Sequence, residues 1–74
     1  MRVTVKLFAN FRVGRFKVED REIPAGTEIG DIVRSLKIPE EELGIVMVNG
    51  RHATLGQPLS EGDTLSLFPL VGGG

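Results

Sequence analysis

The sequence predicts an α+β fold in which one main helix packs on one face of a mixed sheet of four or five strands. Residues 2–8 and 64–68 alternate apolar and polar side chains with period two, which is typical of half-buried strands. Residues 29–36 instead repeat their apolar side chains at helical spacing. With 74 residues, the chain has room for only one hydrophobic core.

The first part of the chain is predicted to form an antiparallel hairpin. Its first strand is expected to direct Val3, Val5 and Leu7 into the core and Thr4, Lys6 and Phe8 away from it. Gly14 can adopt the positive φ that the connecting loop needs. Residues 15–23 alternate less clearly, and Phe16 and Val18 are their predicted inward pair.

The helix is predicted to follow the break at residues 24–26, with Thr27 as its N-cap. Its apolar face is formed by Ile29, Ile32, Val33 and Leu36. Pro39 is expected to end the helix, and residues 40–42 are expected to form a solvated turn.

The second half of the chain predicts further strands. Residues 45–48 are continuously apolar, as expected for a strand with both faces covered or near the centre of the sheet. The Asn49-Gly50 pair predicts a type I′ turn, so residues 51–53 should begin a short returning strand. Residues 64–68 form the last strand, with Leu65 and Leu67 inward, and Pro69 is expected to end the pairing.

If the first and last strands pair in parallel at the centre of the sheet, the helix that connects the two halves of the chain closes a single hydrophobic core. That arrangement is the β-grasp, or ubiquitin-like, fold. We expect residues 1–70 to form a single β-grasp domain and residues 71–74 to form a flexible tail of the diglycine type.

Composition excludes several classes of function. The net charge of −1 and the pI of about 5.7 argue against a nucleic-acid partner. The absence of cysteine excludes thiol chemistry, and a metal site is not expected from one histidine without cysteine. No apolar run approaches the length of a membrane span, and we expect a soluble, cytoplasmic protein with no membrane partner.

Three short motifs, in order, resemble the MoaD/ThiS family of ubiquitin-like sulfur carriers, which includes the small subunit of molybdopterin synthase. They are Val48-Asn49-Gly50, then Leu59-Ser60-Glu61-Gly62-Asp63, then the terminal run Leu67-Phe68-Pro69-Leu70-Val71-Gly72-Gly73-Gly74. The stretch Lys6-Leu7-Phe8-Ala9 also resembles the first strand of the molybdopterin branch. The resemblance covers the whole chain.

The resemblance implies a carrier that is not itself an enzyme and binds no cofactor. An E1-like adenylating partner would consume ATP to activate the carboxylate of Gly74, with Gly73 as its companion, and a sulfur donor would convert it to a thiocarboxylate. The sulfur would then pass to a precursor in the large subunit of molybdopterin synthase or in an equivalent acceptor enzyme. The physical chemistry agrees, because residues 71–74 span roughly 13 Å when extended and glycine fits a narrow channel.

The tail departs from the family pattern at two positions. This chain has Leu70 where the family usually has a second proline, and Gly72 where another small residue is usual. We expect Leu70 to loosen the backbone just past the sheet. If the glycine-rich end were only a frayed terminus, residues 72–74 would carry no chemistry.

Phe8 and Phe68 interrupt the polar side of two strands that are predicted to be neighbours. An aromatic pair on an uncovered face is a candidate docking patch, although both rings would cap the core if they folded over the strand ends. The resemblance adds His52, where the family more often has an apolar residue. The predicted partner-binding residues are Phe8, His52, Phe68, Pro69, Leu70, Val71 and Gly72.

The sequence leaves more than one function open. The motifs at residues 6–9 and 68–69 favour a sulfur carrier for molybdopterin, the dithiolene of molybdenum and tungsten cofactors. The alternatives are a thiamine-thiazole sulfur carrier and a ubiquitin-like modifier joined to lysines, although ubiquitin has an arginine where this chain has Gly72. A purely binding domain of the same fold would not need a glycine terminus.

Overall fold

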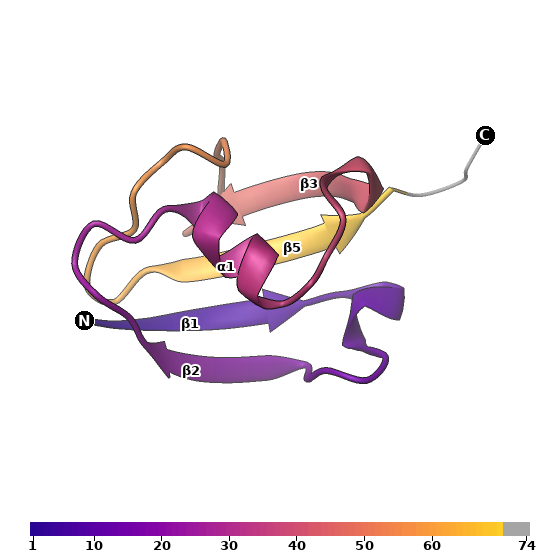
Figure 1. Cartoon of the computed structure of the whole chain (residues 1–74), viewed down its shortest axis with the longest axis horizontal. Coiled ribbons are helices and arrows are strands. Elements are labelled where there is room, and N and C mark those ends of the chain that lie inside the picture. Colours follow the sequence, from indigo (N-terminus) through magenta and orange to yellow (C-terminus); the bar gives the residue numbers. More distant parts are fainter. Residues whose placement is uncertain (71–74) are drawn as a thin grey trace.

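The computed structural model contains one sheet of five strands in the order β2-β1-β5-β3-β4 (Figure 1). The structure describes residues 1–70. The strands are β1 (Arg2–Leu7), β2 (Val18–Glu22), β3 (Leu43–Val48), β4 (Arg51–His52) and β5 (Thr64–Pro69). β1 and β5 pair in parallel, and all other neighbours are antiparallel. The predicted mixed sheet, with the first and last strands adjacent in a β-grasp arrangement, is therefore confirmed.

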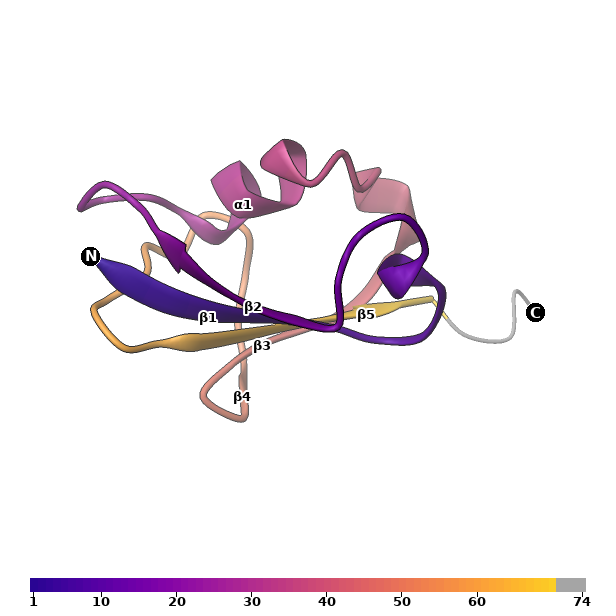
Figure 2. The ribbon, with the colours of Figure 1, turned by 90° about the horizontal axis from the view of Figure 1, so that it is seen from below.

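Helix α1 (Ile29–Ser35) crosses one face of the sheet and closes the core against it (Figure 2). The predicted apolar face of the helix is buried there, together with the inward residues of β1 and β5; these are Ile29, Ile32, Val33, Leu36, Val3, Val5, Leu7, Leu65 and Leu67. No helix within residues 1–70 is long and apolar enough to span a membrane.

The helix begins one residue later than predicted, with Glu28 instead of Thr27 as its N-cap. The Glu28 backbone N–H donates to the Asp31 carboxylate at 2.9 Å, which ties the first turn together. The Thr27 hydroxyl instead donates to the Pro24 carbonyl at 2.7 Å. The prediction was wrong because the turn that precedes the helix already uses the threonine side chain.

At its other end, α1 stops at Ser35, before the chain reaches Pro39. Lys37 follows with a φ of 58°, in the left-handed region. The Ile38 N–H donates to the Val33 carbonyl at 3.2 Å, and the Lys37 N–H donates to the Arg34 carbonyl at 3.0 Å. These bonds form a Schellman turn, which ends the helix without help from a proline.

The first hairpin differs from the prediction at Val18, which is 52% exposed. Val18 pairs with the outward residue Lys6, so its side chain points away from α1. Phe16 does pack against the core, but it precedes β2 and therefore does not set the alternation of that strand. Phe11, in the short 3-10 helix η1 (Ala9–Arg12), supplies a core side chain that is only 3% exposed. Gly14 has the expected positive φ, 70°.

The β3–β4 connection is the predicted turn, since Asn49 and Gly50 have φ values of 52° and 80°. A second 3-10 helix, η2 (Glu40–Glu42), leads into β3. Pro69 does not end the pairing as predicted, because it lies in β5 opposite Leu43. Proline lacks an N–H of its own, but the next N–H, that of Leu70, donates to the Glu42 carbonyl at 2.9 Å.

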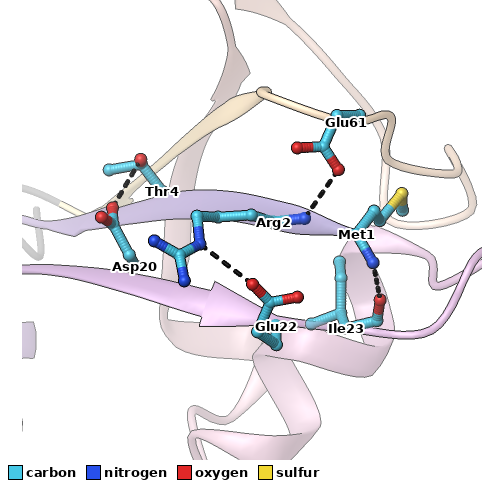
Figure 3. Close-up of polar contacts among 7 residues, drawn as sticks. All are labelled: Met1, Arg2, Thr4, Asp20, Glu22, Ile23 and Glu61. Atoms are coloured by element: carbon cyan, nitrogen blue, oxygen red, sulfur yellow. Dashed lines mark hydrogen bonds and ion pairs between the residues drawn. The ribbon is translucent and has the colours of Figure 1, made fainter.

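The end of the sheet where β1 begins is held by polar groups (Figure 3). Arg2 pairs with Glu22 across β1 and β2 at 3.0 Å, and its backbone N–H donates to the Glu61 carboxylate at 2.9 Å. The Thr4 hydroxyl donates to Asp20 at 2.8 Å. These contacts lie at the end of β1 opposite to the end at which Phe8 is placed.

Candidate functional site

The face of the sheet that α1 leaves uncovered carries an apolar cluster, which we call the open-face patch: Phe8, Ile45, Met47 and Phe68. The patch crosses three adjacent strands, because Ile45 pairs with Phe68 and Phe8 directly follows β1 beside β5. Its members alternate along β3 and β5 with the inward Val46, Val48, Leu65 and Leu67. Figure 2 shows α1 on the other side of the sheet.

Phe8 and Phe68 stack on each other. Their ring centroids are 4.1 Å apart, and the ring planes differ by 10°. The Arg12 guanidinium lies 5.3 Å from the centroid of Phe8, and its Nε donates to the Leu7 carbonyl at 2.7 Å, which fixes the cation over the ring. Neither ring belongs to the core or packs against it, so the two do not cap the strand ends.

His52 lies on the same face but apart from the stacked rings. It pairs with Met47 across β3 and β4, and β3 separates it from Phe68 on β5. Its side chain is exposed. Among residues 1–70, no group of three histidine, aspartate or glutamate side chains is arranged to hold a metal ion.

The root of the predicted tail is the end of β5, which lies beside the end of β1 in the parallel pair (Figure 1). Phe8 directly follows β1, so the stacked rings lie at this end of the sheet. Pro69 directly follows Phe68, and the Leu70 side chain is 63% exposed. Leu70 was predicted to loosen the backbone just past the sheet. Its N–H instead donates a hydrogen bond to the Glu42 carbonyl, which fixes the backbone at this residue. The predicted site residues Val71, Gly72, Gly73 and Gly74 lie outside the described residues.

Sequence reasoning placed Phe8 and Phe68 correctly but missed their neighbours Ile45 and Met47. The apolar run at residues 45–48 predicts a strand with both faces covered or near the centre of the sheet. β3 does lie inside the sheet, between β5 and β4, but one of its faces is not covered, and Ile45 is 42% exposed. A single helix can cover only one face of a sheet, so a strand that is apolar on both faces must expose one of them. Ile45 and Met47 can therefore be recognised from the sequence as the exposed side of that strand. The contact of Arg12 with Phe8 cannot, because it does not affect the periodicity of either residue's segment.

The chain resembles known proteins over its whole described length. The ThiS family model matches residues 5–74. A Pyrococcus furiosus protein named as a candidate molybdopterin converting factor subunit 1 is 30% identical, with a TM-score of 0.78, over 96% of this chain and 99% of that one. SAMP1, the small archaeal modifier protein 1 of Haloferax volcanii, is 27% identical, with a TM-score of 0.75, over 100% of both chains.

A more distant structure, a complex of subunits 1 and 2 of the molybdopterin-converting factor from Helicobacter pylori, shares the fold. It is 22% identical, with a TM-score of 0.67, over 100% of both chains. A sequence search of curated proteins found no match. The family match spans nearly the entire sequence, and the fold is the one expected from the sequence. The chain belongs to the ThiS family.

Proposed function

We propose that this chain is a sulfur carrier whose working group is the carboxylate of Gly74, and that it serves molybdopterin biosynthesis. The observation that carries the proposal is the placement of the open-face patch. It lies on the open face at the end of β5, and only Leu70 and Val71 separate that strand from the terminal glycines in the sequence. A partner that docks on Phe8 and Phe68 would therefore receive the tail beside its docking surface.

The chemistry requires two steps in the partner's site. The Gly74 carboxylate attacks the α-phosphorus of ATP, so that pyrophosphate leaves and an acyl adenylate forms. A sulfide supplied by the donor then attacks the acyl carbon, and AMP departs with the bonding electrons. A thiocarboxylate remains, with one oxygen replaced by sulfur, and the partner supplies every catalytic group.

Two features support molybdopterin as the destination of the sulfur. The 30% identity to the Pyrococcus protein covers both chains almost completely. The Helicobacter relative of the same fold is seen together with its subunit 2. We therefore propose a large synthase subunit as the acceptor enzyme and, because activation consumes ATP, the cytoplasm as the place of action. A thiazole precursor of thiamine is the alternative acceptor for a carrier of the same chemistry.

A second function, that of a ubiquitin-like modifier, is favoured by the 27% identity to SAMP1 over both full chains. The first step is the same, since a modifier is also adenylated at its terminal carboxylate. The steps differ afterwards, because the amine of a lysine then replaces sulfide as the nucleophile. The two functions can therefore be separated only by the product.

The test is to incubate the purified chain with an E1-like enzyme of the same organism, ATP and sulfide. A carrier gains the mass difference between sulfur and oxygen. Deleting Gly74, or adding a residue after it, should abolish the gain without changing the melting temperature. Gly73→Ala should fold normally but react slowly, because a methyl group must enter a channel shaped for glycine.

Two results would contradict the proposal. A modifier would appear on target proteins as an added mass of 8.0 kDa less one water. A binding module would gain no mass, and a chain without Gly73 and Gly74 would bind its partner as well as the intact chain does.

A further inference from the structure

Gly44 interrupts the regular pairing of β3 with β5. Leu43 pairs with Pro69 and Ile45 pairs with Phe68, so two steps along β3 match one step along β5. Gly44 is the extra residue, and the irregularity is a β-bulge. The bulge faces the last residue of the sheet before the chain continues toward the terminal glycines.

The glycine at this position is required for space and not for backbone angles. The φ of Gly44 does not lie in the left-handed region. A Cβ on Gly44 would lie 2.6 Å from the Pro69 carbonyl oxygen, 2.9 Å from the Pro69 carbonyl carbon and 3.0 Å from the Leu70 nitrogen. All three atoms belong to one peptide group of the backbone, so no flexible side chain can move aside.

The same peptide group is held on a second side by a hydrogen bond. The Leu70 N–H donates to the Glu42 carbonyl at 2.9 Å. Leu43, between Glu42 and Gly44, packs against the core and anchors this part of β3. The Leu70 side chain contributes little to the arrangement, since it is 63% exposed. Backbone contacts with residues 42–44 therefore set the orientation of the Pro69–Leu70 peptide.

We infer that Gly44 is a positioning residue, which sets the orientation of the Pro69–Leu70 peptide, the root of the chain that carries the Gly74 carboxylate. The inference rests on the proposed function, in which the Gly74 carboxylate must reach ATP in a partner while the open-face patch is docked. A displaced Pro69–Leu70 peptide would shift the point from which the chain continues, relative to the docked open-face patch.

The expected consequence of Gly44→Ala is a local displacement of residues 69 and 70. They lie at the end of β5, so the clash can be relieved by loss of the Leu70–Glu42 hydrogen bond. The matched control is Gly56→Ala, because Gly56 has no positive φ and no atom within 4 Å of a new Cβ. Both variants add one methyl group at an exposed glycine.

The first measurement needs no partner. Amide hydrogen exchange by NMR should show the Leu70 N–H protected in the unmodified chain and in Gly56→Ala. In Gly44→Ala it should exchange about 5- to 10-fold faster, as expected for the loss of one hydrogen bond. An unprotected Leu70 N–H in the unmodified chain would overturn the inference, even if Gly44→Ala failed to fold.

The second measurement is adenylation by the E1-like enzyme, followed by pyrophosphate release at saturating carrier concentration. For Gly44→Ala we expect the rate to fall about 10- to 100-fold while KM stays within a factor of about two, because the docking surface is intact and the carboxylate is misplaced. Gly56→Ala should match the unmodified chain.

The outcomes separate this inference from the proposed function. If the unmodified chain and Gly56→Ala are adenylated and Gly44→Ala reacts equally fast, only the role of Gly44 is overturned. If the unmodified chain is not adenylated, the proposed function fails, and the role of Gly44 in that reaction fails with it. In that case, the hydrogen-exchange rate of the Leu70 N–H still shows whether residues 42–44 fix the orientation of the Pro69–Leu70 peptide.

Discussion

The two faces of the sheet are made by alternate residues of the same strands, yet they differ sharply. Leu65 and Leu67 are 0% exposed beneath α1, whereas Phe68, the next residue along β5, lies on the open face. Both faces carry apolar side chains near the end of β5, but only one of them has a helix to cover it. The covered face accounts for stability, and the open face is the one that we propose a partner covers.

The largest effect is expected on the covered face. Leu67→Ala should lower the free energy of unfolding by about 2–5 kcal/mol, because it removes packed atoms from a fully buried site. Chemical denaturation monitored by circular dichroism measures the change. A loss below about 1 kcal/mol would show that this face is not the main source of stability.

The adjacent residue should behave in the opposite way. Phe68→Ser, or Phe8→Ser, should cost less than about 1.5 kcal/mol of stability, since it breaks one half-buried aromatic stack that lies outside the core. The same change should weaken binding of the large-subunit or E1-like partner by about 2 kcal/mol or more if the ring anchors the interface. Titration calorimetry and denaturation, applied to the same samples, measure both quantities.

Val18→Ser provides the matched control for the patch. Val18 is an exposed apolar residue on the same face but outside the patch, opposite Lys6. It should leave partner binding unchanged. If Val18→Ser and Phe68→Ser weakened partner binding equally, the whole open face would bind nonspecifically and the patch would not be a specific docking surface.

A smaller effect tests the helix that covers the inner face. Lys37 holds a positive φ in the turn that ends α1, a conformation that glycine adopts without strain. In Lys37→Gly, relief of this strain opposes the greater conformational entropy that glycine gives the unfolded chain. The free energy of unfolding should therefore change by no more than about 1 kcal/mol. A loss well beyond that value would contradict the role assigned to this turn.

The smallest effect concerns the start of the same helix. The Glu28 backbone N–H, and then the Arg34 side chain, hold the pKa of Asp31 below its usual value of 3.8. The folded-state pKa is lower than the unfolded one, so the stabilisation is present above pH 3.8 and is lost as the pH falls through the folded pKa. Asp31→Asn should flatten the acid side of the stability profile, which thermal melts between pH 2 and 6 would show.

Most of the fold could be predicted because its strands follow simple periodicity. The alternation in β1 and β5 and the Asn49-Gly50 turn left few other arrangements. The errors arose where a local contact overrode the pattern. The Thr27 hydroxyl bonds to Pro24, so Glu28 caps the helix, and Phe11 enters the core from a 3-10 turn that no period describes.

The candidate site was predicted only in part, for a related reason. Phe8 and Phe68 could be found because they break the alternation of their own strands. Arg12 could not, since it reaches Phe8 only through the local path of η1, which has no periodicity. Gly44 could not, since it acts through Pro69 and Leu70, and that contact depends on the register between β3 and β5, which a single sequence does not specify.

The most direct test of the central claim is to locate sulfur on the chain. Trypsin should release residues 52–74 as one peptide, which contains no lysine, arginine or methionine, so oxidation of Met1 or Met47 cannot imitate the mass change. After reaction with the E1-like enzyme, ATP and sulfide, we predict that fragmentation of this peptide places the exchange of oxygen for sulfur on Gly74. An unchanged Gly74, with the partner active on its own substrate, would contradict the account.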